Sequence, residues 1–216
     1  MLELPDNGLY RTYDIAKGWE KFQFGDGMNE NVFVVYSSPL VPGTIWVGTA
    51  TGVLVSKDDG QTWSKVGGMP ENVPVSSITS DPKRPNYLYV GTTQSIYFSR
   101  DGGRTWAPTV RGNLPLGNYA SILIDPNNTD EVFAASALES DGGVFYSDDA
   151  GKKWKRVDNK DMKVPSRRVW TMAFDPSNPR TIFAGSHSSG VYRIERRQES
   201  AEAKTTAPKP ASADGN

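Results

Sequence analysis

The chain has 216 residues, enough for one or two domains of ordinary size, and its 24 Lys plus Arg nearly balance 25 Asp plus Glu. This balance argues against a protein that works mainly by whole-molecule attraction to nucleic acid or anionic membranes, so we expect no nucleic-acid partner. The absence of cysteine excludes disulfides, thiolate nucleophiles and zinc sites with Cys ligands. The 21 Gly and 15 Pro indicate many tight turns.

No stretch reaches the roughly 20 apolar residues of a membrane-spanning helix, so no membrane span is expected. The N-terminal segment Met1–Asp6 lacks a basic region followed by an apolar run, which predicts no signal peptide in this chain. Two alternatives for the compartment stay open: a cytoplasmic protein, or a chain that lacks its true N-terminus.

The first predicted elements are strands over Gly8–Thr12 and Trp19–Phe24, joined by a turn of a kind that recurs along the chain. This first copy of the turn, Thr12–Trp19, keeps Thr, Asp and Trp but has lost a glycine. Three nearly complete copies follow: Ser56–Trp63, Ser99–Trp106 and Ser147–Trp154. The copies begin at residues 12, 56, 99 and 147, so the chain has an internal repeat with a period of about 45 residues.

Each complete repeat predicts four strands. An Asp-Pro turn, or Ser-Pro in the first repeat, precedes one apolar run, and a Gly or Ser precedes a second run that enters the repeated turn. In the repeat that contains Ser99–Trp106, the predicted strands are Val75–Thr79, Tyr87–Gly91, Ile96–Ser99 and Trp106–Val110. The last repeat supplies only Val169–Phe174, Thr181–Gly185 and Gly190–Ile194, with no fourth strand.

The four predicted strands differ in character. The second and third are apolar on both faces, which is typical of buried strands. The fourth carries charges in Trp154–Val157 and a proline at Pro108, and because proline cannot donate to a ladder, this strand is expected at a sheet edge. The pattern and its period predict an all-β fold: a β-propeller of four-stranded antiparallel blades, with about four blade equivalents, partial or open.

The repeated turn residues are expected to have a structural role. The glycine can supply positive φ, the aspartate can accept from backbone N–H groups of the turn, and the tryptophan can bury its ring against the neighbouring blade. Catalytic or calcium-binding aspartates are the alternative, disfavoured because every blade has a copy. The predicted structural residues are Asp14, Trp19, Asp58, Gly60, Trp63, Asp101, Gly103, Trp106, Asp149, Gly151 and Trp154.

The pattern Ser-x-Asp-x-Gly-x-Thr-Trp, with the preceding Asp-Pro and Val-Gly-Thr segments, resembles the BNR/Asp-box repeat family of the WD40/YVTN-like superfamily. The resemblance covers residues 8–195. Family members include sialidases, xyloglucan-cleaving glycosidases, sortilin-type receptor domains and photosystem II assembly factors, and many are secreted or periplasmic. The resemblance implies a β-propeller, and it leaves open the choice between an enzyme and a binding module.

The domain prediction follows from the strand count. Residues 1–197 form an Asp-box propeller, with three complete blades over residues 32–157 and partial blades at both ends, and residues 198–216 form a disordered tail because they contain no large apolar side chain. The family commonly has six or seven blades. Three alternatives therefore stay open: a piece of a larger propeller, a chain that pairs with another chain, or a closed four-bladed ring whose termini share a blade.

For an open arc we expect exposed apolar side chains at the two ends, and hence self-association or pairing with a missing N-terminal propeller segment. The side chains expected to be exposed are Leu9, Trp19, Phe22, Trp170 and Phe183.

An enzyme is disfavoured. The resemblance to sialidases would require an Arg-Ile-Pro segment near the start of the propeller, and the chain has none. Glycosidases need a carboxylate pair at a defined separation, and no pair stands out from the turn aspartates. His187 is the only histidine, so we expect no metal site and no cofactor. The alternative function is a glycoside hydrolase of the sialidase or xyloglucanase type, or a fragment of one.

The predicted binding face is the one opposite the Asp-box turns. Its loops differ between repeats in length and content, and variable loops on a repeated frame are where binding is usually found. We expect Arg167, Arg168, Trp170 and His187 to meet there in the last repeat. The stretch Lys152–Arg168 is rich in cations, which suits a docking patch or simply a solvated edge. The leading prediction is a non-catalytic propeller module that binds a protein or a glycan.

Overall fold

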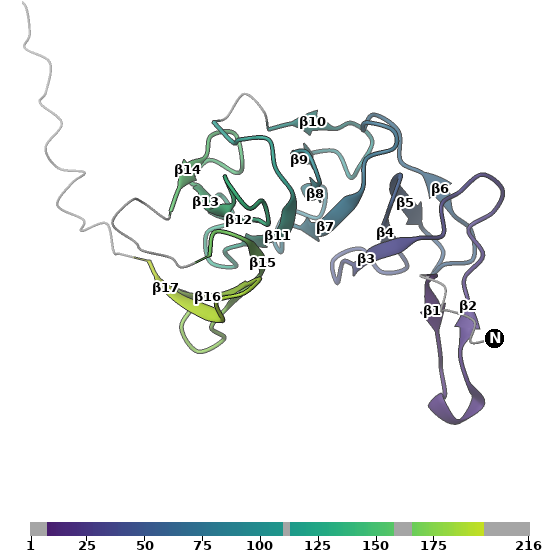
Figure 1. The fold of residues 1–216 in the computed structure, drawn as a ribbon. Coiled ribbons are helices and arrows are strands. Elements are labelled where there is room, and N and C mark those ends of the chain that lie inside the picture. The colour runs from purple at the N-terminus through teal and green to yellow at the C-terminus, as the bar shows by residue number, and fades with distance from the viewer. Residues whose placement is uncertain (1–7, 110–112, 158–165, 197–216) are drawn as a thin grey trace, which may run out of the picture.

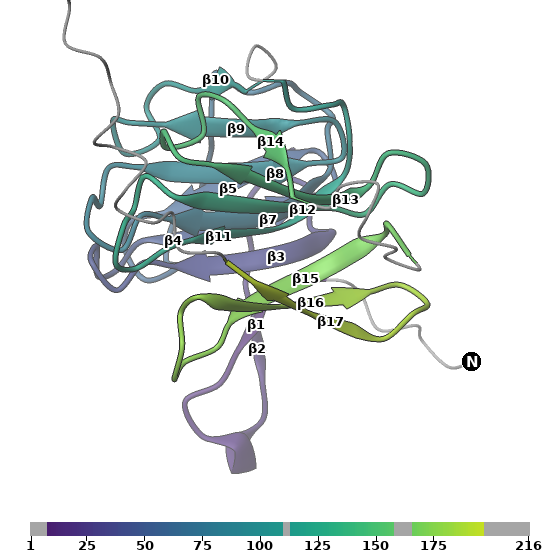
Figure 2. The ribbon, with the colours of Figure 1, turned by 90° about the vertical axis from the view of Figure 1, so that its left-hand side faces the viewer.

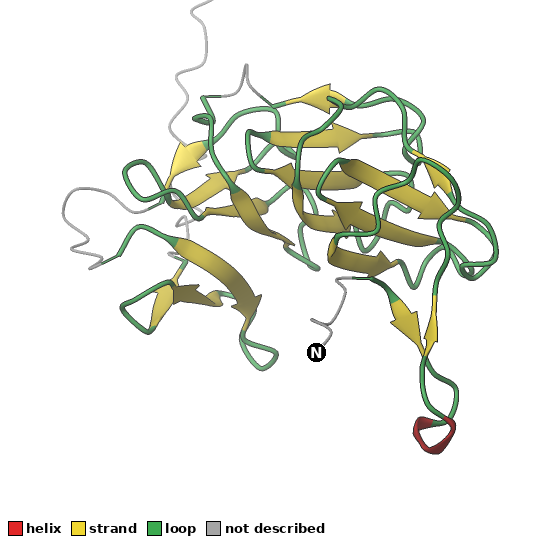
Figure 3. Cartoon of the chain, turned by 45° about the vertical axis from the view of Figure 1, so that its right-hand side comes forward, coloured by secondary structure: helices red, strands yellow, loops and turns green. Residues whose placement is uncertain are grey.

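The computed structural model describes residues 8–109, 113–157 and 166–196. The predicted tail over residues 198–216 lies outside these residues. Within them the chain folds almost entirely into antiparallel β-sheets whose strands follow one another in sequence order (Figure 3). Among the described residues, no helix combines the length and apolar character that crossing a membrane requires.

The N-terminal hairpin is a two-stranded sheet of β1 (Tyr10–Arg11) and β2 (Glu20–Lys21), joined through the 3-10 helix η1 (Ile15–Lys17). Its strands are shorter than predicted. The hydrogen bond from Phe22 N to Leu9 O, 2.8 Å, corresponds to the bond from Val66 N to Val53 O between a third and a fourth strand. The hairpin is therefore the outer half of a blade.

Three four-stranded sheets follow, and we call them the first, second and third blade. The first contains β3 (Val32–Ser37), β4 (Ile45–Thr49), β5 (Gly52–Ser56) and β6 (Ser64–Lys65). The second contains β7 (Val75–Ser80), β8 (Leu88–Thr92), β9 (Ile96–Ser99) and β10 (Ala107–Pro108). The third contains β11 (Tyr119–Ile124), β12 (Val132–Ser136), β13 (Gly143–Ser147) and β14 (Lys155–Arg156).

The last blade has three strands, β15 (Val169–Phe174), β16 (Thr181–Ser186) and β17 (Val191–Glu195), in that order. In the complete blades the short fourth strand lies at the outer edge, as Pro108 in β10 predicted. In the last blade β17 is the edge strand, and its side chains alternate between exposed and half-buried.

The blades are arranged as an open arc, with β3, β7, β11 and β15 on its inner side (Figure 1). Seen from the C-terminal end, the blades stack one behind another and the N-terminal hairpin projects below them (Figure 2). The prediction of an all-β, partial propeller with four-stranded antiparallel blades is confirmed.

The core consists of apolar layers between adjacent blades rather than one central cluster. Between the first and second blades, Trp46 and Val55 pack with Ile78 and Val90; between the second and third, Tyr89 packs with Ile122 and Trp154. A third layer joins the third blade to the last one. A fourth cluster joins the first blade to the N-terminal hairpin, where Phe24 packs with Val47 and Trp63.

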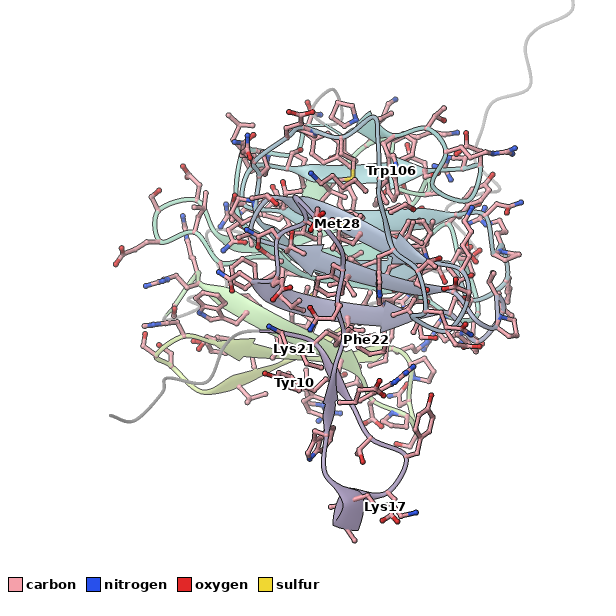
Figure 4. All side chains as sticks on the ribbon, turned by 90° about the vertical axis from the view of Figure 1, so that its right-hand side faces the viewer. Tyr10, Lys17, Lys21, Phe22, Met28 and Trp106 are labelled. Atoms are coloured by element: carbon pink, nitrogen blue, oxygen red, sulfur yellow. The ribbon has the colours of Figure 1, made fainter. Side chains whose placement is uncertain are left out.

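The prediction of exposed end residues is correct for Trp19, Trp170 and Phe183 and wrong for Leu9 and Phe22. Both of these are half-buried, because they pack on the cluster of Trp63 and its neighbours in the first blade. Figure 4 shows Phe22 where the hairpin meets that blade, with Lys17 at the far tip. Further exposed apolar residues are Phe33, Val35 and Val191.

Candidate functional site

The two faces of the arc have different architectures. On one face, the turn between the first and second strands is bonded to the Asp-box turn of the same blade: Asp59 N donates to Gly43 O at 3.0 Å, and Gly102 N donates to Asn86 O at 2.9 Å. The third blade repeats this contact between Ala150 N and Asp130 O, at 2.8 Å. The repeated bond makes the Asp-box face a regular one.

Asp101 accepts four hydrogen bonds inside its turn. They come from Thr105 Oγ1 at 2.6 Å, Ser99 Oγ at 2.8 Å, and the backbone N–H groups of Thr105 and Arg104 at 2.9 and 3.0 Å. The bond from the Thr105 hydroxyl is the main reason that the pKa of Asp101 lies well below its usual range. The carboxylate is thus fully engaged by its own turn, as Asx-type bonding predicts.

The Asp-box of the first blade has the same bond from a Thr hydroxyl, and all three complete copies share the geometry of their glycine and tryptophan. The pKa of Asp58 is lowered to about 2, chiefly by the bond from the Thr62 hydroxyl and further by bonds from the Thr62 N–H and the Ser56 hydroxyl. The glycines have φ values of 84–85°, and each tryptophan Nε1 donates to the carbonyl of its own Asp-box glycine; these residues are Gly60, Gly103 and Gly151, with Trp63, Trp106 and Trp154.

The N-terminal copy and the third complete copy differ in detail. Asp14 caps η1 by accepting from Ala16 N at 3.0 Å, and Trp19 is exposed. Asp149 accepts from Ser147 Oγ and from the backbone N–H groups of Lys152 and Lys153. Its pKa is lowered because these bonds outweigh the opposing effect of partial burial. The structural role of the Asp-boxes stays a prediction, tested below.

The opposite face carries the loops between second and third strands and between blades. At the first blade it is hollowed by a cavity of about 280 Å³, lined by Asn29, Thr49 and Thr51 and by the segment from Gly67 to Asn72. In the third blade the corresponding loop after β12 is held against the rest of the face, because Arg156 Nη2 donates to the carbonyl of Gly142.

Three of the four predicted binding residues lie together on this face. The guanidinium of Arg168 stands 5.8 Å from the centroid of the Trp170 ring, and the Trp170 and His187 rings are 6.2 Å apart. His187 N donates to Arg168 O at 2.9 Å, which ties the loop after β16 to the start of β15. Trp170 sits at a register shift between Val169 and Thr171, so its ring is exposed.

The fourth predicted residue, Arg167, is exposed and does not belong to the stacked group of the other three. The Nε atom of Arg168 is buried and has no hydrogen-bond partner among the described residues. Within the cationic stretch, Lys155 pairs with Asp148 at 3.4 Å, and the predicted cations Lys160 and Lys163 lie outside the described residues.

Arg196 joins the last blade to the third blade, a role that the sequence analysis did not predict. It follows β17 at the position that the Asp-box aspartate has after the other third strands, and it bonds to the carboxylates of Asp125 and Glu131 in the third blade. Its guanidinium also lies 5.1 Å from the centroid of Phe133. Alignment of Ile194-Glu195-Arg196 with Ser147-Asp148-Asp149 would have shown the exchange of aspartate for arginine.

Within the described ranges, acidic and His side chains form no cluster of three or more that could hold a metal ion. The carboxyl pKa values that depart from the ordinary value are all lowered, at Asp58, Asp101, Asp125, Asp149 and Asp175. All five are turn residues that accept from neighbouring backbone N–H groups, which keeps the carboxylate ionised.

No curated protein matches the sequence. Among solved structures, an ancestral GH74 enzyme is similar to 79% of this chain, with 25% identity and a TM-score of 0.66. The GH74 xyloglucanase from Xanthomonas campestris matches over 89% of the chain, with 16% identity and a TM-score of 0.70. The GH74 enzyme from Niastella koreensis matches over 87%, with 18% identity and a TM-score of 0.66.

The chain spans 23% of the first of these structures, 34% of the second and 33% of the third. Their folds agree with the BNR-type propeller that the Asp-boxes predicted. The family model described as "Sortilin, neurotensin receptor 3" matches residues 51–164, which is more than half of the 216 residues. The chain therefore belongs to the Sortilin-Vps10 family of β-propellers.

Proposed function

We propose that this chain is a non-catalytic interaction module that binds a protein or glycan ligand on the loop face of its last blade. The observation that carries the proposal is the group of Arg168, Trp170 and His187, which come from the start of β15 and from the loop after β16 and lie together around an exposed indole ring. Trp and Arg side chains at an interface often contribute a larger share of the binding free energy than of the buried area.

The group has the chemistry of a stacking platform. An indole offers a flat apolar surface on which a sugar ring or an aromatic side chain can pack, and a guanidinium beside it strengthens the contact by cation–π attraction. The unpaired Nε of Arg168 is a buried donor, and such a donor is stabilised when an acceptor reaches it. These features suit a ligand that combines a flat apolar face with an acceptor or anionic group.

A glycoside hydrolase of the sialidase or xyloglucanase type is the second candidate, and the likeness to GH74 structures favours it. Two observations weigh against it. The chain spans a third or less of the GH74 structures named above. A glycosidase also needs a carboxylic acid whose pKa is raised, whereas the shifted carboxyl pKa values of this chain are lowered.

Two assays separate the candidates. The purified chain is incubated with sialosides, xyloglucan and β-glucans, and we expect no turnover above a blank. Binding is then screened on a glycan array and a peptide library, and Trp170→Ala should weaken the best hit at least about tenfold. Tyr13→Ala is the control, because Tyr13 is exposed in the distant N-terminal hairpin. Robust turnover, or equal loss in both variants, would overturn the proposal.

A further inference from the structure

The boundary between the second and third blades is bridged on the Asp-box face by two arginines of the second blade. Arg84 Nη1 donates to the carboxylate of Asp130 at 2.8 Å, and Arg100 Nη2 donates to the carbonyl of Ala150 at 2.8 Å. Both guanidinium groups also lie over the ring of Tyr87, at 4.4 and 4.3 Å from its centroid. The two side chains therefore span this boundary from one blade to the next.

The first and second blades are also neighbours along the arc (Figure 1), but the first blade has neither arginine. In the turn that precedes the second strand, Val41 holds the position of Arg84. Directly after the third strand, Lys57 holds the position of Arg100. Valine is too short to reach the next blade, and among the described residues the ammonium group of Lys57 has no partner. Neither side chain bridges this boundary.

A cavity of about 390 Å³ lies at the boundary between the first and second blades, and we call it the junction cavity; its lining includes Val41, Trp46, Lys57, Leu88 and Arg104. Its second-blade wall also contains the counterparts of the three residues to which Arg84 and Arg100 bind in the third blade: Pro85, Asn86 and Gly102 for Thr129, Asp130 and Ala150. The cavity thus takes the space that corresponds to the two guanidinium groups. Ligand pockets commonly have about 300–1,000 Å³.

The inner part of the junction cavity is apolar. Trp46 and Leu88 are 5% and 2% exposed. At the rim Val41 is 36% exposed, and Leu40 beside it is 43% exposed. The other three turns have polar or charged residues at these two positions: Lys83-Arg84, Asn127-Asn128 and Ser177-Asn178. Only the turn beside this cavity therefore continues the apolar surface beyond it, which suits a ligand larger than the cavity itself.

Two cations line the junction cavity from opposite blades, Lys57 from the first and Arg104 from the second. Arg104 Nε donates to the carbonyl of Asp101 at 3.0 Å, which orients the guanidinium group. Among the described residues, neither cation forms an ion pair. Asp101 lines the cavity as well, but its carboxylate already accepts four bonds from its own turn. The two unpaired cations favour an anionic group on the ligand.

We propose that the junction cavity binds an acidic peptide segment of a partner protein, in which a bulky apolar side chain stands next to Asp or Glu. The apolar side chain packs against Val41, Trp46 and Leu88, and the carboxylate pairs with Lys57 and Arg104. A peptide segment also extends past the cavity over the apolar rim, which a small free anion does not. The site lies on the Asp-box face and is independent of the proposed ligand site on the loop face.

The test begins with end-blocked, fluorescein-labelled peptides whose central pairs are Phe-Glu, Glu-Phe, Leu-Glu and Glu-Leu, flanked by Gly and Ser. Fluorescence anisotropy with the full chain should give a Kd below about 1 mM for at least one of them. In that peptide, exchange of Glu for Gln should weaken binding about fivefold, and exchange of the apolar residue for Ala at least about tenfold. No binding by any of the four, or equal binding after exchange of Glu for Gln or Lys, overturns the proposal.

A double variant closes the cavity with the protein's own chemistry. Val41→Arg with Asn86→Asp rebuilds the ion pair that Arg84 forms with Asp130 at the next boundary. The melting temperature should stay the same or rise, and binding of the peptide should weaken at least about tenfold because the side chain of the new arginine occupies the cavity. Unchanged binding by this folded variant would place the peptide elsewhere and overturn the proposal.

Single variants test the charges independently of that double variant. Arg104→Ala should weaken peptide binding about fivefold. Lys152→Ala is the matched control, because Lys152 holds the position of Arg104 at the boundary that the arginines bridge, and it should leave the Kd unchanged. Trp170→Ala should leave it unchanged too, which separates this site from the loop-face site. Equal losses in Arg104→Ala and Lys152→Ala would show attraction to the surface as a whole and overturn the proposal.

Discussion

The indole of Trp46 stands edge-on to that of Trp106, with 6.4 Å between ring centroids and an interplanar angle of 80°, across the boundary between the first and second blades. The same Trp46 ring lies against the backbone of Gly103, where an added Cβ would stand 2.3 Å from Cη2. The Asp-box of one blade is thus shaped to fit the aromatic residue of the blade before it. This packing links one repeat to the next, together with hydrogen bonds between blades such as that from Tyr89 Oη to Ala150 O.

Gly103→Ala should therefore destabilise the fold by about 2–4 kcal/mol, since it adds an overlap with the Trp46 ring to the strain of a φ of 85°. The matched control is Gly68→Ala. Gly68 also has a positive φ, 79°, but an added Cβ would be no closer than 3.9 Å to its neighbours, so about 1 kcal/mol is expected. Urea unfolding measures both; equal losses would mean that backbone strain alone matters.

The fold could be predicted because its information is local and repeated. Asp-boxes at a fixed period define the blades, and Pro108 placed its strand at an edge. Contacts between ends far apart in sequence could not be predicted in this way. The packing of Leu9 and Phe22 on the first blade was missed because it depends on how the hairpin folds back, and no repeat contains that information.

The candidate site was predictable in part. Arg168, Trp170 and His187 were placed together because the start of the first strand and the loop after the second strand must emerge on one face of the last blade. Arg167 joined that prediction through sequence adjacency alone, yet neighbouring residues in an extended segment point in different directions. Arg196 was missed because its role depends on partners in the third blade.

Asp101→Ala should lower the melting temperature by roughly 2–8 °C, because four donors of the Asp-box turn lose their acceptor. The Asp-box face lies opposite the proposed ligand site, so affinity per folded molecule should not change. Calorimetry and a binding titration of the best array hit test the two statements together. Normal melting with lost binding would show that the Asp-box is a functional site.

Acid should destabilise the fold through the same turns. The folded-state pKa of Asp58 is about 2, below the ordinary value of about 3.9 for an unfolded chain. Its contribution to stability is therefore complete above about pH 4 and is lost as the pH falls toward 2. The midpoint of urea unfolding should fall over this window in the wild type and fall less steeply in Asp58→Asn. Identical slopes would contradict this assignment.

The last blade should depend on Arg196 more than on any surface ion pair. Its guanidinium bonds to Asp125, which is almost fully buried, and to Glu131, and it covers the ring of Phe133. Asp125 keeps the backbone N–H of Asn127 as a donor after the arginine is removed, but its charge then lacks a buried partner. Arg196→Ala should therefore cost about 2–4 kcal/mol in the free energy of unfolding.

Lys155→Ala is the control for that measurement. Lys155 pairs with Asp148 at 3.4 Å within the third blade, and both side chains are largely exposed. Loss of this ion pair should therefore cost no more than about 0.5 kcal/mol in the free energy of unfolding. Both variants are measured with the wild type at the same protein concentration, and Lys155 and Arg196 line the same groove. Equal, small effects would show that Phe133, Phe174 and Ile182 hold the last blade in place by apolar contact alone.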